Sequence, residues 1–321
     1  MPSHRLSAAA LAAASALLLA GCASGEAEGT EDDGRIDVVA STNVYGQLVE
    51  DIAGDLVDVT SIITSNAQDP HSFEASAQDQ LAVADADLII ENGGGYDPFI
   101  DGLIESSGTG ATVLTAVEFS SEWTGGSAHD DSAHDEGEDA DEHEHVEGFN
   151  EHVWYDPHAM SDLVVAVASE LSLLSPDDAD AFTSAADALA AEIATLEASL
   201  AEIEAAHAGE DVFVTEPIPY YLIKGAGLTD VTPPAFSEAV EEGLDVAPAI
   251  LLESIKLLEG GDVRVVFINA QTGGAETTQV IDEASANGIP VVEFAETLPE
   301  GQTYLSWMQD NIAAIQDALE E

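Results

Sequence analysis

Residues 36–63, IDVVASTNVYGQLVEDIAGDLVDVTSII, decide the fold of this chain. Two runs rich in β-branched residues, 36–41 and 57–63, flank a segment at 44–53 whose apolar residues recur at helical spacing. A strand, a helix and a second strand in this order are typical of parallel sheets, because the helix returns the chain to the edge where the first strand began. We therefore predict an α/β fold that begins with a β-α-β unit.

The same alternation continues along the chain in two sets. In the first set we expect further strands at 87–91 and 111–115 and helices at 77–84 and 98–106. In the second set we expect strands at 211–215, 264–269 and 289–294 and helices at 246–259, 276–287 and 304–319. The sequence thus predicts two parallel-sheet lobes.

A stretch rich in Ala, Leu and Glu separates the two sets. It starts at 175–178, SPDD, which has the composition of a helix N-terminus, and its pattern continues to His207 before Gly209. A helix over 175–208 would be about 50 Å long. A coiled coil or a solvent-bridging helix is the alternative, but the alanine-rich spacing favours one rigid helix packed along both lobes.

The amino terminus indicates export. Arg5 precedes an uncharged run at 8–20, and the segment ends in Leu19-Ala20-Gly21-Cys22. This ending resembles a bacterial lipoprotein signal, which implies cleavage before Cys22 and attachment of lipid to its sulfur; a buried cysteine in a helix is the alternative. Cys22 is the only cysteine, so no disulfide can form within the chain. We expect the protein to be anchored by lipid to the outer face of the cell membrane.

The expected organisation follows from these segments. It comprises a signal peptide at 1–21, a flexible tether at 22–34, an N-terminal lobe at 35–174 with an insert at 127–151, the linker helix at 175–208 and a C-terminal lobe at 209–321.

The charge balance excludes one class of partner. The chain has 64 acidic and five basic residues, for a formal net charge of −59. Such a surface repels nucleic acid. It fits a protein that stays soluble in high salt, a hypothesis that circular dichroism across a salt series would test: full folding in dilute buffer would argue against it.

The insert contains the tract AHDDSAHDEGEDADEHEH at 128–145. Its histidines are His129, His134, His143 and His145. Such a segment lacks the apolar residues of a core, but its imidazoles and carboxylates suit weak capture of zinc. A solvated acidic loop is the alternative, because the chain is acidic throughout.

Three further segments carry a resemblance to a known family. They are DPHSFE at 69–74, EHVWYDP at 151–157 and TEP at 215–217. In this order and spacing they resemble the metal-site motifs of the solute-binding proteins that supply zinc or manganese to ABC importers. The resemblance covers essentially the whole mature chain, including the linker helix and the insert. It implies a monomeric receptor that delivers its metal to a membrane permease powered by a separate ATPase.

Carried over residue by residue, the resemblance implies that His71, His152 and Glu216 are metal ligands in a cleft between the lobes. Each lies just after a strand or at a helix start, where loops of open α/β sheets bind ligands. Two imidazoles and a carboxylate suit zinc, whereas manganese prefers more oxygen donors. The alternatives are local: either histidine can cap a turn, and Glu216 can be an ordinary acid at a helix start.

The fourth ligand is open. The resemblance implies an Asp shortly after the strand at 265–268, but residues 269–276 are NAQTGGAE. Asn269, Gln271, Glu276 or a water molecule are the candidates for this position.

Two other functions use related features. Two histidines, a glutamate and an open position also occur in zinc hydrolases. The chain has no His-Glu-x-x-His motif and no phosphate-binding loop, so we expect no enzymatic activity. A lipid-anchored surface adhesin is the third possibility.

Overall fold

The computed structural model describes residues 34–125 and 148–321. The predicted signal peptide, the lipidation site Cys22 and the insert residues His129, His134, His143 and His145 lie outside this part. Residues 36–321 belong to one structural unit. Within the described residues, no helix combines the length and the apolar character needed to cross a membrane.

The first lobe is built on a parallel four-stranded sheet. Its strands are β1 (Ile36–Thr42), β2 (Val57–Ile63), β3 (Leu88–Glu91) and β4 (Thr112–Thr115), and its helices are α1 (Asn43–Ala53), α2 (Ala77–Asp85), α3 (Pro98–Ser107) and α4 (Pro157–Leu174). The strand order is β2-β1-β3-β4, with Val38 paired to Val59 on one side and to Leu88 on the other. Strands β1 and β3 therefore lie in the centre of the sheet, and β2 and β4 form its edges.

The second lobe repeats this arrangement. Its strands are β5 (Asp211–Val214), β6 (Thr229–Asp230), β7 (Val263–Asn269) and β8 (Val291–Phe294), and its helices are α6 (Tyr220–Gly225), α7 (Pro234–Glu241), α8 (Pro248–Gly260), α9 (Ala275–Asn287) and α10 (Tyr304–Glu320). All strands are parallel in the order β6-β5-β7-β8. The predicted fold class, two parallel-sheet α/β lobes, is confirmed.

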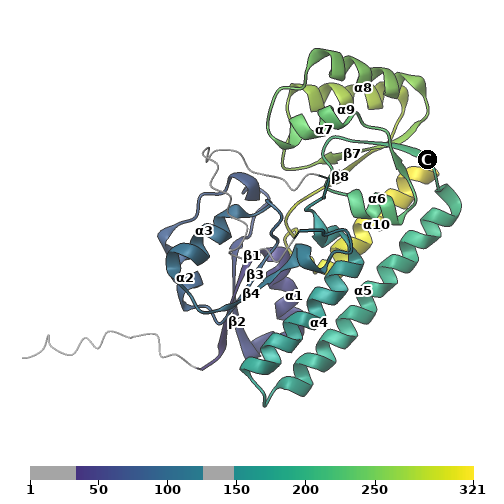
Figure 1. Ribbon diagram of the computed structural model, residues 1–321. Coiled ribbons are helices and arrows are strands. Elements are labelled where there is room, and N and C mark those ends of the chain that lie inside the picture. The colour runs from purple at the N-terminus through teal and green to yellow at the C-terminus, as the bar shows by residue number, and fades with distance from the viewer. Residues whose placement is uncertain (1–33, 126–147) are drawn as a thin grey trace, which may run out of the picture. The chain divides into compact units, whose positions relative to one another are not determined.

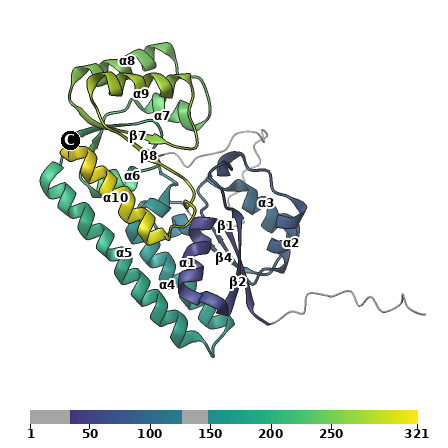
Figure 2. The ribbon, with the colours of Figure 1, turned by 180° about the vertical axis from the view of Figure 1, so that it is seen from behind.

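Both sheets are covered on both faces, as parallel sheets usually are. In the first lobe α2 and α3 lie on one face and α1 and α4 on the other, which Figures 1 and 2 show from opposite sides. The side chains of β1 alternate accordingly: Val38 and Ala40 join the core under α1 and α4, and Val39 joins the core under α2 and α3. Strand runs that are apolar at nearly every position therefore bury both faces.

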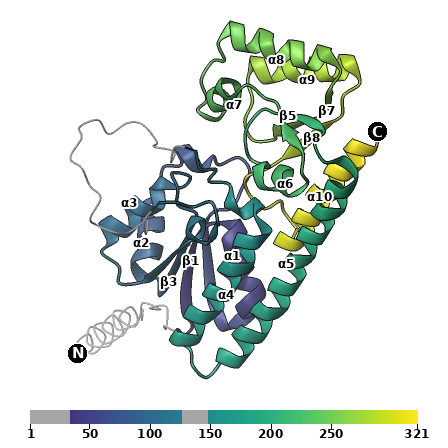
Figure 3. The same cartoon turned by 45° about the vertical axis from the view of Figure 1, so that its right-hand side comes forward.

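Helix α5 (Ala179–His207) packs against both lobes. It contacts α1 and α4 of the first lobe and α6 and α10 of the second, and Figure 3 shows it running along them. Its buried residues recur at spacings of three and four: Phe182, Ala186, Leu189, Ile193, Leu196, Leu200 and Ile203. One hydrophobic core accordingly contains residues of both sheets, such as Val38 and Val212.

Helix α5 begins later than the sequence pattern indicates. Residues 175–178 form a turn, in which Ser175 Oγ donates to Asp178 Oδ2 at 2.7 Å, and the helix starts at Ala179. The reason is that α4 continues to Leu174 and packs against α5, so residues 175–178 form the turn between the two helices instead of the first turn of α5.

Candidate metal centre

The candidate ligands lie on loops that follow strands of both sheets. His71 follows β2, His152 lies between β4 and α4, and Glu216 follows β5. Because all strands in each sheet are parallel, these loops leave from the same edge of their sheet. The loops of the two lobes meet there.

Local hydrogen bonds fix His71. It lies in a short 3₁₀ helix, Pro70–Ser72, whose N-cap Asp69 accepts a hydrogen bond from His71 N at 3.0 Å and another from Ser72 Oγ at 2.8 Å. The edge-to-face contact with Tyr96, 5.0 Å between ring centroids, orients the imidazole. The side chain of His71 remains 15% exposed.

His152 is more deeply buried, with 1% of its side chain exposed. Asn150 Oδ1 accepts from His152 N at 3.0 Å and lies 3.3 Å from the ring nitrogen Nδ1. The indole of Trp154 packs against the imidazole, with 5.2 Å between centroids. This arrangement leaves Nε2 as the metal-facing nitrogen, since Nδ1 is engaged by Asn150.

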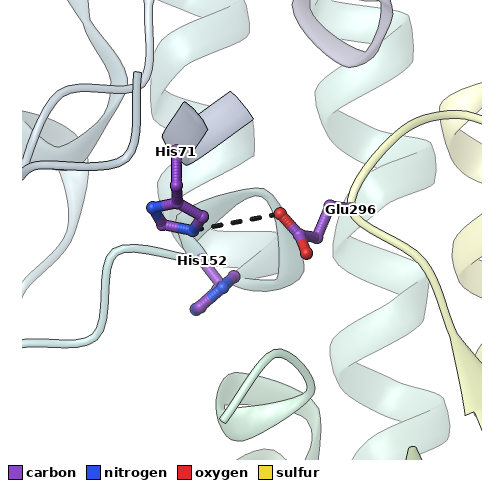
Figure 4. A group of neighbouring side chains, drawn as sticks. All are labelled: His71, His152 and Glu296. Carbon is purple, nitrogen blue, oxygen red and sulfur yellow. Dashed lines mark ion pairs between the residues drawn. The ribbon is translucent and has the colours of Figure 1, made fainter. Parts of the chain in front are cut away.

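The structure adds Glu296, which the sequence reasoning missed. His71 Nε2 lies 4.0 Å from Glu296 Oε2, and ligand atoms of His71, His152 and Glu296 all lie within 4.8 Å of one another. Figure 4 shows the two imidazoles of the first lobe beside the carboxylate that follows β8. Small movements of these three side chains would bring their ligand atoms within bonding distance of one divalent cation.

The register of the second sheet explains this position. Asn269, the last residue of β7, pairs with Phe294, the last residue of β8. Glu296 is two residues beyond Phe294, so it occupies the same sheet edge as the segment after β7. The sequence carries a signal for this position, a carboxylate just after the predicted strand at 289–294, but the family resemblance implied a ligand within residues 269–276.

Hydrogen bonds to the first lobe hold the segment that carries Glu296. Asn43 and Leu298 exchange two bonds of 2.9 Å, from Asn43 Nδ2 to Leu298 O and from Leu298 N to Asn43 Oδ1. Tyr155 Oη donates to Ala295 O at 2.8 Å, and Thr297 Oγ1 donates to Asn66 Oδ1. The segment 295–298 is therefore fixed to the lobe that provides both histidines.

Glu216 lies beside this group and is joined to it through Asn269. Asn269 Nδ2 donates to Glu216 Oε2 and to Glu296 Oε1, at 2.7 Å in both cases. Thr272 Oγ1 donates to the other oxygen, Glu216 Oε1. The two carboxylates therefore share one amide donor, but among the described residues Glu216 is not in the group whose ligand atoms lie within 4.8 Å of one another.

The three residues suggested for the fourth position have other contacts. The amide of Asn269 faces the two carboxylates with its NH₂ group, while its Oδ1 accepts from Gln271 N at 2.8 Å. Gln271 Oε1 accepts from Glu296 N. Glu276 lies in the first turn of α9 and is not among the described residues whose ligand atoms cluster with His71 and His152.

Burial dominates the electrostatics of the two carboxylates. It raises the pKa of Glu216 to about 7, against the opposing hydrogen bond from Asn269. Burial, and then the charge of Glu216, raise the pKa of Glu296 to about 8. A divalent cation would reverse this cost by replacing the protons and pairing with both charges. Chemically, the site is suited to reversible binding of a cation with two nitrogen and two oxygen donors.

Comparison of the sequence with known proteins identifies the family of this chain. A sequence model of the family described as zinc-uptake complex component A, periplasmic, matches residues 38–318. The chain is 23% identical over 317 residues to the zinc-binding lipoprotein AdcA of Streptococcus pneumoniae, which covers 97% of this chain and 60% of AdcA. It is 29% identical over 183 residues to the manganese-binding lipoprotein MntA of Halalkalibacterium halodurans, covering 57% of this chain and 54% of MntA.

The fold also matches solved structures. The laminin binding protein Lmb of Streptococcus agalactiae, described as bifunctional with adhesin and metal transporting activity, superposes with a TM-score of 0.69 at 23% identity. The match covers 88% of this chain and 99% of Lmb. The chain thus spans nearly all of Lmb but only 60% of the length of AdcA.

Proposed function

This chain belongs to the zinc-uptake complex component A family, and from that premise we propose that it is an extracytoplasmic solute-binding lipoprotein that captures zinc and delivers it to the permease of an ABC importer. The observation that carries the proposal is the group formed by His71, His152 and Glu296, whose ligand atoms lie within 4.8 Å of one another. Glu216 is the fourth ligand, brought in from its place beside Asn269. The charges of two carboxylates balance those of one divalent cation.

Zinc is favoured over manganese by the donor set. Two imidazoles with two carboxylates complete a tetrahedral shell for zinc, whereas manganese takes a larger shell of oxygen donors. At a given set of nitrogen and oxygen donors zinc also binds more tightly than manganese. AdcA and MntA, named for zinc and manganese respectively, make manganese the alternative cargo to be tested.

Release of the metal rests on local movement. Helix α5 packs along helices of both lobes, and the segment 295–298 is hydrogen-bonded to the first lobe. A wide hinge opening would break both sets of contacts, so rearrangement around Glu216 is the less costly route. The lipid anchor on Cys22 would keep the receptor near its permease.

The family is one of receptors, which argues against the hydrolase alternative. Assays on ester and peptide reporters with zinc-loaded protein test this directly. Turnover that is lost in His71→Ala would establish an enzyme, and its absence leaves capture and delivery as the function of the site.

The decisive experiment measures metal content by mass spectrometry and zinc and manganese binding by calorimetry, on residues 23–321. His71→Ala is compared with His158→Ala, since His158 lies on α4 with 64% of its side chain exposed. We expect tight zinc binding to be lost in His71→Ala and kept in His158→Ala. Zinc retained at full affinity in His71→Ala would move binding to the histidine-rich insert and refute the proposal.

A further inference from the structure

His152 belongs to a second group of potential ligands besides the one just described. Ligand atoms of Glu151, His152 and Glu241 lie within 4.8 Å of one another, and His152 Nε2 is 3.9 Å from Glu241 Oε1. Imidazole nitrogens and carboxylate oxygens are both zinc ligands. We call this group the relay position.

Glu241 reaches the relay position from the second lobe. It is the last residue of α7, and Phe236 anchors that helix by packing in the core against Phe213, with 5.3 Å between ring centroids. Bonds from Gly243 N to Val240 O and from Leu244 N to Ala239 O then close the helix end. The helix dipole disfavours a negative charge at this end, so a cation beside Glu241 would offset an existing cost.

Glu151 is held on the opposite side, in the first lobe. Asn92 Nδ2 donates to its backbone carbonyl at 2.9 Å, and only 3% of the residue is exposed. The relay position combines two carboxylates with one imidazole, so a divalent cation would balance the two negative charges.

The two groups cannot both hold a cation through His152 at once. Nδ1 of His152 is engaged by Asn150, so Nε2 serves both groups. The side chain of Glu241 is 12% exposed, whereas that of Glu296 is 3% exposed, so the relay position has the carboxylate with more access to water. The other group has a second imidazole, His71, which zinc prefers over a further oxygen donor.

We propose that zinc first binds between Glu151, His152 and Glu241, and that His152 then passes it to His71, Glu296 and Glu216. This inference rests on the proposed function and deepens it, by assigning Glu241 a role in capture and not in the final affinity shell. It predicts a rate effect: because zinc passes the relay position on the way in and on the way out, Glu241 accelerates association and dissociation by the same factor and leaves the affinity of the final site unchanged.

The kinetic test compares Glu241→Gln with Glu238→Gln, which removes the same charge from an exposed position on the same helix. Stopped-flow tryptophan fluorescence follows zinc binding, since Trp154 packs against His152. We expect the association rate constant to fall about tenfold in Glu241→Gln, within the range of electrostatic steering, with an equal fall in the dissociation rate constant and an unchanged dissociation constant. Equal association rates in the two variants, or a faster dissociation in Glu241→Gln, would overturn the proposal.

A structural test locates the cation directly. In crystals of His71→Ala soaked in zinc, we expect an anomalous peak between Glu151, His152 and Glu241 that disappears in the double variant with Glu241→Gln. Zinc found only elsewhere would refute the relay position. The proposed function fails separately, if the unaltered chain shows no tight zinc binding at all.

Discussion

The carboxylates of Glu216 and Glu296 accept hydrogen bonds from one nitrogen, Asn269 Nδ2, each at 2.7 Å. Burial raises the pKa of both groups, to about 7 for Glu216 and about 8 for Glu296, and the charge of Glu216 raises the pKa of Glu296 further. A divalent cation bound by both carboxylates would offset the cost of burying their two negative charges.

Zinc binding should therefore release protons. At pH 6 both carboxyls carry a proton before binding, and at pH 9 neither does. We expect release of about two protons per zinc at pH 6, falling towards zero at pH 9, and an affinity that rises over the same range. Calorimetry in buffers of different ionisation enthalpy measures this number. A count that does not change with pH would show that these carboxyls do not bind the metal.

The stability of the metal-free protein should fall as the pH rises. The folded-state pKa values of Glu216, Glu296 and Asp97 are raised above their ordinary values, so the folded chain binds more protons than the unfolded chain. The resulting stabilisation is complete below about pH 4 and is lost as the pH rises through 7 to 8. Urea unfolding at constant salt with a chelator should show a loss on the order of a few kcal/mol between pH 5 and 8.5. Saturating zinc should remove most of this loss; a stability that rises with pH without metal would contradict the electrostatics described.

Glu296→Gln should weaken zinc binding by about 100-fold, roughly 2.7 kcal/mol, because it replaces a charged ligand by a neutral one of the same shape. The matched control is Glu293→Gln, an exposed acid on β8. Competition with a chelator of known affinity measures both. Equal affinity of the two variants would exclude Glu296 from the metal shell.

Asn43→Ala should affect the metal site from a distance. It removes both hydrogen bonds to Leu298 and so loosens the segment that carries Glu296. We expect a loss of about 1–2 kcal/mol in the free energy of unfolding and a several-fold faster release of zinc. Asn287→Ala is the control, because Asn287 Nδ2 bonds only to Glu283 in its own helix among the bonds described. Unchanged release in Asn43→Ala would show that the segment is held by its other bonds alone.

Deletion of residues 128–145 should lower the number of bound zinc ions and leave the tight site intact. The deletion removes His129, His134, His143 and His145, for which we propose weak capture of zinc. Calorimetry at high zinc concentration counts these sites. An unchanged stoichiometry would favour a merely solvated acidic loop.

The sequence was sufficient for most of the fold. The strands predicted at 36–41 and 57–63 are β1 and β2, and the helix predicted at 44–53 is α1, within a residue or so at each end. Local apolar periodicity determines such elements directly. Of the elements for which no range was predicted, β6, α6 and α7 are short, with two, six and eight residues, whereas α4 has 18 residues.

The start of α5 shows the limit of local signals. A capping sequence at 175–178 was present, but the helix begins at Ala179 because the preceding helix continues to Leu174. Packing between neighbouring helices decided which residues formed the turn. Propensity is a weak prior where such contacts compete with it.

By itself the sequence determined the two sheets and placed His71, His152 and Glu216 on loops that follow strands or begin helices. Tertiary structure decided which acids meet those histidines. Glu296 joins them because β8 pairs with β7 in a register that brings the two strand ends together, and Glu241 because α7 ends opposite His152. Local patterns fix strands and helices through contacts between near neighbours, but a ligand set is assembled from residues far apart in the sequence, such as His71 and Glu296, and only long-range pairing and packing bring them within reach.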